Sequence, residues 1–199
     1  MRGNFSKETQ FLKALTIHKR RIMIRIRIHG RGGQGAVTFA HMLCLSATEE
    51  GKFGQSSQGQ SWDRRGTPME GYARIGDKSI SERGFITEPD YVVVLDPTIV
   101  GAVNLEAGMK DDGKVIVNSH VGLKFKHQSF CIDATSIALD KLNAPITNTA
   151  MLGAFVRATG LVCLDSVERG VRKILGKKFS EKVINNNIEA VRAAFNEVK

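Results

Sequence analysis

A strand that runs directly into a glycine-rich turn and then a helix is the feature that most constrains the fold of this 199-residue chain. From Ile22 to His29, isoleucine alternates with methionine, arginine and histidine, and this period of two predicts a strand. The glycine-rich turn occupies residues 30–35, and apolar residues then recur at helical spacing from Val37 to Ala47. The pattern therefore predicts that the domain opens with a β-turn-α unit.

Three continuous apolar runs farther along predict central strands of a parallel sheet, because such strands are covered on both faces. These runs are residues 91–95, 115–117 and 130–132, with helix-compatible residues between the first two. Residues 69–74 and 79–83 are predicted to form two short strands joined by a turn, as a small antiparallel excursion. The polar stretch from Lys52 to Pro68 predicts a long surface loop.

Helical spacing dominates the C-terminal part of the chain. Apolar residues predict helices over 137–142, 151–159, 165–175 and 184–195, and Asp165 with Glu168 has the spacing of a capping box. Strands alternating with helices predict an α/β fold: a Rossmann-like, doubly wound, mostly parallel sheet with a small antiparallel excursion and a helical C-terminal part. We expect a single domain over residues 22–199 and a basic N-terminal extension over residues 1–21.

The formal net charge of +9 is concentrated at one end of the chain. Residues 1–31 hold nine Lys and Arg and one acid, Glu8, so they carry +8 and the rest of the chain carries only +1. A nearly neutral body lacks the clustered cations that bind a phosphate backbone, so no nucleic-acid partner is predicted. Since no apolar run approaches the roughly 18 residues of a membrane span, we expect a cytoplasmic protein without a membrane partner.

The chain lacks the motifs of a metal site or of a complete catalytic apparatus. Its three cysteines have no CxxC spacing, and no nucleophile elbow, P-loop lysine or HExxH motif is present. His29 adjoins the glycine turn but has no identifiable catalytic partner. Asp96 and Asp133 each follow an apolar strand, so both are expected at the carboxyl edge of the sheet, either as ligand contacts or as helix caps.

The glycine turn is the first candidate binding site. Its glycines match G-x-G-x-x-G spacing, which permits a tight turn, and the N–H groups at the helix start attract an anion such as a phosphate. The alternative is that these glycines only pack the helix on the strand. A dinucleotide is disfavoured, because residues 52–61 contain no Asp or Glu to hold its ribose.

A second candidate is the arginine loop, Asp63-Arg64-Arg65-Gly66-Thr67-Pro68. Two adjacent arginines next to glycine and proline suit a bidentate grip on a carboxylate or a phosphate. A solvated charge run, or an ion-pair contact with another subunit, is the alternative interpretation of Arg64 and Arg65.

Several ordered motifs together resemble a known family, the gamma subunits of the 2-oxoacid:ferredoxin oxidoreductases, of which pyruvate synthase is the best known. The resemblance covers about residues 22–198. It rests on HGRGGQGAVTFA at 29–40, EEGKFGQ at 49–55, DRRGTPMEGYARIGD at 63–77, PDYVVVLDPT at 90–98, IDATSIA at 132–138 and NTAMLGAFVRATG at 148–160.

The resemblance implies that the chain is a non-catalytic gamma subunit. Partner subunits of alpha, beta and delta type would hold thiamine diphosphate, magnesium and [4Fe–4S] clusters. The complex would convert pyruvate or a related 2-oxoacid and coenzyme A to acyl-CoA and CO2, with ferredoxin as electron acceptor. The gamma subunit would contribute to assembly and to coenzyme A access, with no tightly bound cofactor of its own. The sequence from Gly59 to Arg64 departs from the family's pattern, which leaves the 2-oxoacid open.

The predicted contacts to coenzyme A or to neighbouring subunits are the turn and the two loop arginines: Gly30, Arg31, Gly32, Gly33, Gln34, Gly35, Arg64 and Arg65. No catalytic residue and no metal ligand is predicted. Two alternatives stay open at this point. One is a free-standing dinucleotide-binding dehydrogenase or flavoprotein, and the other is a non-enzymatic regulatory module with a basic tail.

Overall fold

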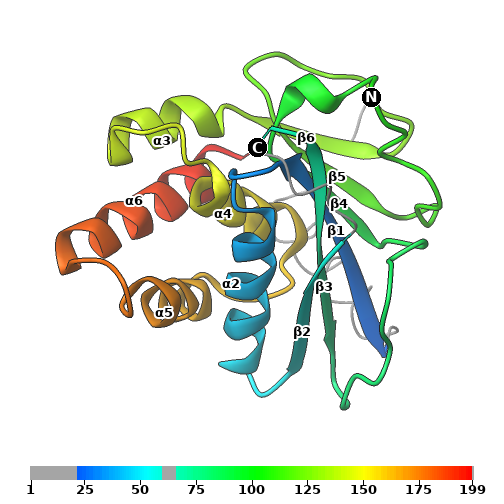
Figure 1. Ribbon diagram of the computed structural model, residues 1–199, viewed down its shortest axis with the longest axis horizontal. Coiled ribbons are helices and arrows are strands. Elements are labelled where there is room, and N and C mark those ends of the chain that lie inside the picture. Colours follow the sequence, from blue (N-terminus) through cyan, green and yellow to red (C-terminus); the bar gives the residue numbers. More distant parts are fainter. Residues whose placement is uncertain (1–21, 60–65, 199) are drawn as a thin grey trace, which may run out of the picture.

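A computed structural model describes residues 22–59 and 66–198, so the basic extension, Arg64 and Arg65 lie outside the described residues. Over the described ranges, one sheet carries a layer of helices (Figure 1). The strands are β1 (Met23–Arg31), β2 (Phe53–Gln58), β3 (Pro68–Gly76), β4 (Tyr91–Val94), β5 (Lys114–Asn118) and β6 (Gln128–Ile132). The α-helices are α2 (Ala36–Thr48), α3 (Ala134–Leu142), α4 (Asn148–Thr159), α5 (Leu164–Leu175) and α6 (Glu181–Glu197).

The sheet has the order β2-β3-β1-β4-β5-β6. Strands β1, β4, β5 and β6 run parallel to one another, whereas β3 lies antiparallel between β1 and β2. The α/β class, the mostly parallel sheet, the antiparallel excursion and the helical C-terminal part are thereby confirmed. Because the parallel strands end at one edge of the sheet, the turn after β1 lies beside the residues that follow β4 and β5.

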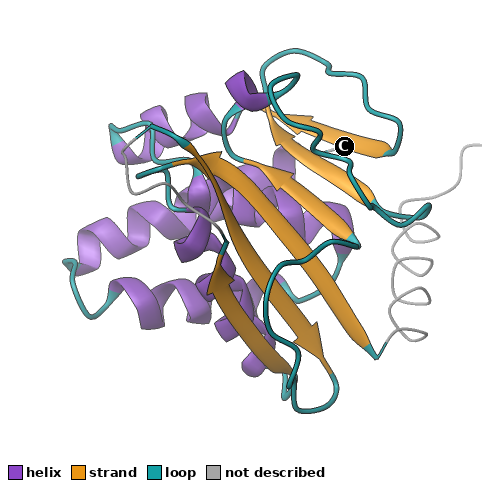
Figure 2. Cartoon of the chain, turned by 45° about the vertical axis from the view of Figure 1, so that its right-hand side comes forward, coloured by secondary structure: helices purple, strands orange, loops and turns teal. Residues whose placement is uncertain are grey.

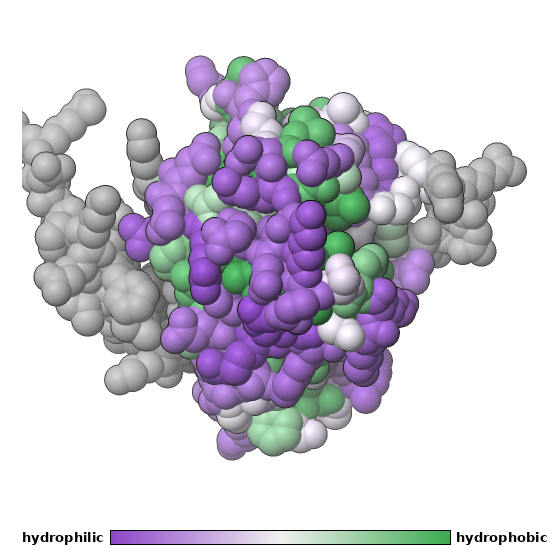
Figure 3. All heavy atoms as spheres, turned by 90° about the vertical axis from the view of Figure 1, so that its left-hand side faces the viewer, coloured by the Kyte–Doolittle hydropathy of each residue, from purple (hydrophilic) through white to green (hydrophobic). Residues whose placement is uncertain are grey.

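The helices lie together on one face of the sheet (Figure 2). The predicted alternation in β1 explains why, since Ile24, Ile26 and Ile28 are buried in the cluster that all five helices share. The opposite face carries none of the five α-helices of the described residues and is called the helix-free face. A short 3-10 helix, Pro97–Ile99, and loops cover it and bury a smaller cluster with β4 and β5. The outward surface of the helix layer is mostly hydrophilic (Figure 3). Among the described residues, no helix is both long and apolar enough to cross a membrane.

Helices α4 and α6 pack with almost no space between their backbones. A Cβ atom at Gly153 of α4 would lie 2.1 Å from the carbonyl oxygen of Val191 in α6. The predicted apolar stripe of the last helix supplies the buried side, with Ile184, Ile188 and Val191 at most 4% exposed. This packing fixes the position of α4 and of its first turn.

The prediction of one long loop from Lys52 to Pro68 was wrong in part, because residues 53–58 form the edge strand β2. Its Gly, Gln and Ser residues show no apolar alternation, since most of its side chains are exposed or half-buried. The strand is held instead by backbone pairing with β3, in the register Phe53 opposite Gly76. Edge strands with one neighbour commonly lack the pattern that marks a buried strand.

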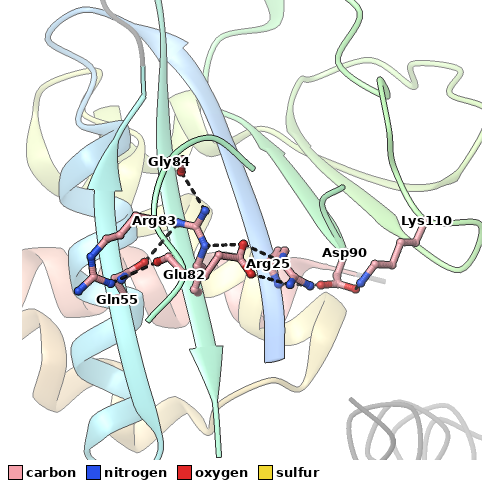
Figure 4. Close-up of polar contacts among 8 residues, drawn as sticks. Arg25, Gln55, Glu82, Arg83, Gly84, Asp90 and Lys110 are labelled. Carbon is pink, nitrogen blue, oxygen red and sulfur yellow. Dashed lines mark hydrogen bonds and ion pairs between the residues drawn. The ribbon is translucent and has the colours of Figure 1, made fainter. Parts of the chain in front are cut away.

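The prediction of a strand at 79–83 was also wrong. Strand β3 already has β1 and β2 as neighbours, so no edge remains for a third partner. The segment instead crosses the helix-free face, where Glu82 points toward Arg25 (Figure 4) and accepts hydrogen bonds from it at 3.1 and 2.7 Å. Glu82 also accepts from Nε of the fully buried Arg74 at 3.1 Å. An ionic contact, not strand pairing, therefore holds this segment.

The predicted capping box in α5 does not form. The N-cap of the helix is Cys163, and no side chain caps it. Glu168 accepts instead from Arg192 of α6, at 2.7 and 2.8 Å. Asp165 lies in the first turn, where an acidic side chain still interacts favourably with the helix dipole.

Candidate functional site

The glycine turn joins the carboxyl end of β1 to the start of α2, as predicted. Gly33 and Gly35 have φ of 97° and 83°, a region that other residues adopt only with strain. Gly35 is the N-cap of α2, and no side chain caps this helix. The backbone N–H groups of the first turn of α2 therefore keep their capacity to donate to a ligand.

The side chains of the turn are engaged within the chain. The backbone N–H of Arg31 donates to Oε1 of Gln34 at 2.7 Å, and Nε2 of Gln34 donates to Oδ2 of Asp96 at 2.7 Å. The Arg31 guanidinium donates to Oγ1 of Thr98 at 2.8 and 3.0 Å and to the carbonyl of Gly66 at 2.9 Å. The turn is thus tied to the residues after β4 and before β3.

Asp96 is the acceptor at the centre of this network. It N-caps the 3-10 helix by accepting from the backbone N–H of Thr98 at 2.9 Å, and Nε of Arg31 lies 3.3 Å from its Oδ2. Burial alone would raise the pKa of Asp96, but hydrogen bonds from Thr98 and Gln34 hold the pKa below its ordinary value. Of the two roles that the sequence left open, this aspartate takes that of a cap. Asp133 does the same for α3, by accepting from Ser136 at 2.9 Å.

A pocket of about 490 Å³ opens on the helix-free face beside Gly30, at the end of β1. Its walls are mostly apolar, with Met69, Phe85, Ile86, Ile99 and Val103 among them. Apart from Thr87, its polar side chains come from alternate positions of the paired strands β1 and β3: Arg27, His29, Glu70 and Tyr72. A concave site with apolar walls and few polar groups is typical of a site that binds a small molecule or a cofactor.

Arg27 fixes the tautomer of His29 in the pocket. Arg27 as a whole is 7% exposed. Its guanidinium donates to the carbonyls of Ile86, Leu105 and Ala107, at 2.9 to 3.2 Å. Its Nε donates to Nε2 of His29 at 3.1 Å. Because arginine can only donate, Nε2 of His29 must be an acceptor, so the ring proton lies on Nδ1.

His29 and Tyr72 both face the carboxylate of Glu70. Burial, with the Arg27 charge, lowers the pKa of His29 to about 3, so the ring is neutral. Its Nδ1 lies 3.4 Å from Oε1 of Glu70, and the Tyr72 hydroxyl donates to Oε2 of the same carboxylate. Burial and this bond raise the pKa of Tyr72, which keeps the hydroxyl protonated. Arg27, His29, Glu70 and Tyr72 therefore form one connected polar network on the floor of the pocket.

The described residues contain no group of three or more His, Cys, Asp or Glu side chains that could hold a metal. The three cysteines lie in separate places, with Cys44 buried, Cys131 half-buried and Cys163 exposed. Burial raises the pKa of Cys44 to about 12, so its thiol is not a nucleophile. The described residues of the pocket thus offer apolar walls and hydrogen-bonding groups that can bind and orient a molecule.

Sequence reasoning missed Glu70 because His29, which faces it, lies 41 positions earlier in the chain, and it missed Tyr72 because the partner of Tyr72 is Glu70. The signal was present in the alternation of the MEGYAR segment, which places both residues on one face of a strand. Only the register, with His29 opposite Glu70, shows that this face adjoins Arg27 and His29. Of the predicted contacts, the structure brings residues 30–35 together, and Arg64 and Arg65 lie outside the described residues.

The fold and the site define a class of protein: an α/β domain with a pocket beside a glycine turn at the carboxyl end of β1. The family model described as pyruvate ferredoxin/flavodoxin oxidoreductase matches residues 25–197. The common gamma subunit of the pyruvate/ketoisovalerate oxidoreductases of Thermococcus kodakarensis is 46% identical over 182 residues, which are 87% of this chain and 96% of that protein. The chain therefore belongs to the pyruvate ferredoxin/flavodoxin oxidoreductase family, as a subunit of gamma type.

One solved structure agrees with this assignment, and a second shows the same fold. The pyruvate oxidoreductase subunit PORC of Thermotoga maritima has 36% sequence identity and a TM-score of 0.79, over 90% of this chain and 98% of that one. The fold also occurs in a 2-oxoglutarate:ferredoxin oxidoreductase from Magnetococcus marinus, solved with 2-oxoglutarate, coenzyme A and succinyl-CoA bound. That match has a TM-score of 0.70 and 15% identity, and it covers 90% of this chain and 32% of the larger one. The predicted resemblance to gamma subunits is confirmed.

Proposed function

We propose that this chain is the non-catalytic gamma subunit of a cytoplasmic 2-oxoacid:ferredoxin oxidoreductase, with residues 22–199 as its single functional domain. The complex oxidatively decarboxylates pyruvate or a related 2-oxoacid to acyl-CoA and CO2, and ferredoxin accepts the electrons. Subunits of alpha, beta and delta type carry thiamine diphosphate, magnesium and the [4Fe–4S] clusters. This chain helps to assemble the complex and admits coenzyme A to it.

One observation carries the coenzyme A role: the pocket of about 490 Å³ beside Gly30. Its volume lies within the range of about 300–1,000 Å³ that is typical of small-molecule sites. The apolar carbons of a pantetheine arm suit walls such as Ile99 and Val103. Its amide N–H groups suit the Glu70 carboxylate, an acceptor on the floor. The larger relative from Magnetococcus marinus, which contains this fold, was solved with coenzyme A bound.

The pocket residues would bind and orient the arm without reacting with it. Arg27 and His29 are already paired, so their role is to hold the Glu70 carboxylate in place as an acceptor. The apolar walls exclude water from the arm. Coenzyme A supplies the thiol that accepts the acyl group, and the thiol's chemistry takes place on the partner subunits.

The topology argues against a dinucleotide at the glycine turn. In dinucleotide-binding folds the strand after the first helix lies next to β1 and ends with the acid that holds the ribose. Here β3 separates β2 from β1, and β2 contains no acidic residue. The dehydrogenase and flavoprotein alternative therefore lacks both the neighbouring strand and the acid.

The test is a bulky residue at the pocket rim of the assembled complex. Val103 is 38% exposed and lines the pocket, so Val103→Trp should obstruct it and raise KM for coenzyme A about tenfold, with kcat for saturating coenzyme A unchanged. Val121, 50% exposed and outside the pocket lining, gives the control Val121→Trp with an unchanged KM. Equal values of KM in both variants would remove the pocket from coenzyme A binding.

The predicted arginine contacts are tested in the same assay. Arg64→Ala combined with Arg65→Ala should raise the coenzyme A concentration that the complex requires, because a bidentate grip on phosphate is lost. An unchanged requirement would take both arginines out of the site. Isolation of the chain from its native source without a thiamine-dependent partner would contradict the subunit assignment itself.

A further inference from the structure

The first turn of a second helix meets the glycine turn. Helix α4 begins at Asn148, whose side chain lies against Gly35, the N-cap of α2. A Cβ atom at Gly35 would lie only 2.5 Å from Nδ2 of Asn148 and 3.2 Å from its Cγ. The N-termini of α2 and α4 therefore converge on the Asn148 amide, and only glycine at position 35 leaves room for it.

Donors at this convergence outnumber their acceptors. Asn148 is 7% exposed, and its Oδ1 accepts from the backbone N–H of Thr149 at 2.9 Å, which turns Nδ2 toward Gly35. Within the described part of the chain, no hydrogen bond is made by Nδ2 of Asn148 or by the hydroxyl of Thr147, which is 6% exposed. A buried donor without an acceptor is costly, so such a group points to a missing acceptor.

The backbone adds further donors of the same kind. Neither α2 nor α4 has a hydrogen bond from its N-cap side chain. Apart from the Thr149 N–H, which donates to Asn148, the N–H groups of the first turns have no acceptor within these helices. The positive ends of both helix dipoles lie at these turns, and neither first turn contains an acidic residue. Helices α2 and α4 have 13 and 12 residues, and their N-termini meet at Asn148. Two helix N-termini at one place favour a negative charge there.

We infer that the N-termini of α2 and α4, with Thr147 and Asn148, form a binding site for a phosphoryl anion. The set consists of neutral donors and two helix N-termini, which is the chemistry that backbone phosphate sites use. That coenzyme A supplies this phosphoryl group rests on the proposed function; inorganic phosphate is the other source. The nearby Arg31 guanidinium is bound to Thr98 and Gly66, so the amides rather than a cation carry recognition.

The test measures the Tm of the full chain with increasing inorganic phosphate, at ionic strength matched with chloride. Binding to the folded state should raise Tm saturably, by about 5 °C at high phosphate. Asn148→Asp keeps the shape and the bond to Thr149 but places a carboxylate where the anion binds. Its Tm without phosphate should equal or exceed that of the wild type, and its phosphate response should vanish.

Two further variants complete the experiment. Asn104→Asp makes the same charge change at an exposed position on the helix-free face and should keep the full phosphate response. Thr147→Val removes one donor with little change of shape and should lose part of the response, which keeps the inference testable if Asn148→Asp fails to fold. A wild-type Tm indifferent to phosphate, or a response retained by Asn148→Asp, overturns the site.

Coenzyme A distinguishes the two sources. If it supplies the anion, coenzyme A should raise Tm and abolish the additional effect of phosphate, whereas pantetheine, which has no phosphoryl group, should not compete with phosphate. If phosphate stabilises the wild type and coenzyme A has no effect, the site stands as a site for free phosphate. The coenzyme A contact of the proposed function then fails independently.

Discussion

The buried imidazole of His29 makes a specific prediction about acid stability. Burial, with the Arg27 charge, lowers the pKa of His29 to about 3 in the folded chain, against about 6.5 in an unfolded one. Between about pH 6.5 and pH 3, His29 is therefore protonated in the unfolded state and neutral in the folded state. Its contribution lowers the free energy of unfolding as the pH falls through this range. Above that window its contribution is fully present.

The magnitude follows from the two pKa values. Between pH 7 and pH 5, His29 should account for a loss of about 2 kcal/mol in the free energy of unfolding. For a chain of this length, that loss corresponds to a fall in Tm of about 4–8 °C. The variant His29→Gln can still accept the bond from Arg27 but has no proton to gain.

The assay is urea unfolding of wild type and His29→Gln at pH 7, 6 and 5. Subtracting the two free energies at each pH isolates the contribution of His29, since the other titrating groups are shared. The difference should shrink by about 2 kcal/mol over this range. Parallel curves would refute the reasoning, because they would mean that His29 takes up its proton equally in both states.

Three substitutions test the packing and the turn. Gly153→Ala should lower Tm, because its Cβ would lie 2.1 Å from the Val191 carbonyl oxygen. This clash should outweigh the preference of helices for alanine over glycine, which is about 1 kcal/mol. Gly122→Ala, where a Cβ would have no atom within 4 Å, is the matched control and should leave Tm unchanged. Arg74→Met should cost about 2 kcal/mol in urea unfolding. Gly35→Ala should cost at least about 1–2 kcal/mol by thermal unfolding and abolish any Tm response to phosphate.

Buried apolar segments could be predicted from the sequence, and segments held by polar contacts could not. The runs at 91–95 and 115–117 could be predicted as strands because a strand covered on both faces has few polar residues. Strand β2 has no such pattern, and Glu82 is placed by Arg25, 57 positions earlier, and by Arg74, 8 positions earlier. Neither the backbone pairing of β2 nor the ionic contacts of Glu82 produce a periodic pattern in the local sequence.

The candidate site divides in the same way. The glycine turn could be predicted from the sequence, since its geometry depends on adjacent residues. The Glu70 carboxylate and the Asn148 amide depend on register and on helix convergence, which only the folded chain shows. Asn148 opens a motif that carried the family resemblance, yet the apolar spacing predicted the helix only from Met151, after the residues at its start.

The fixed glycine turn has a thermodynamic consequence. Bonds among Arg31, Gln34, Asp96 and Thr98 hold the loop in one conformation before any ligand arrives. Ordering a flexible loop on association costs conformational entropy, and this loop has little left to lose. Binding at the turn should therefore need no rearrangement of its backbone. Under the proposed function, a slow step in coenzyme A entry would then arise from movements between subunits.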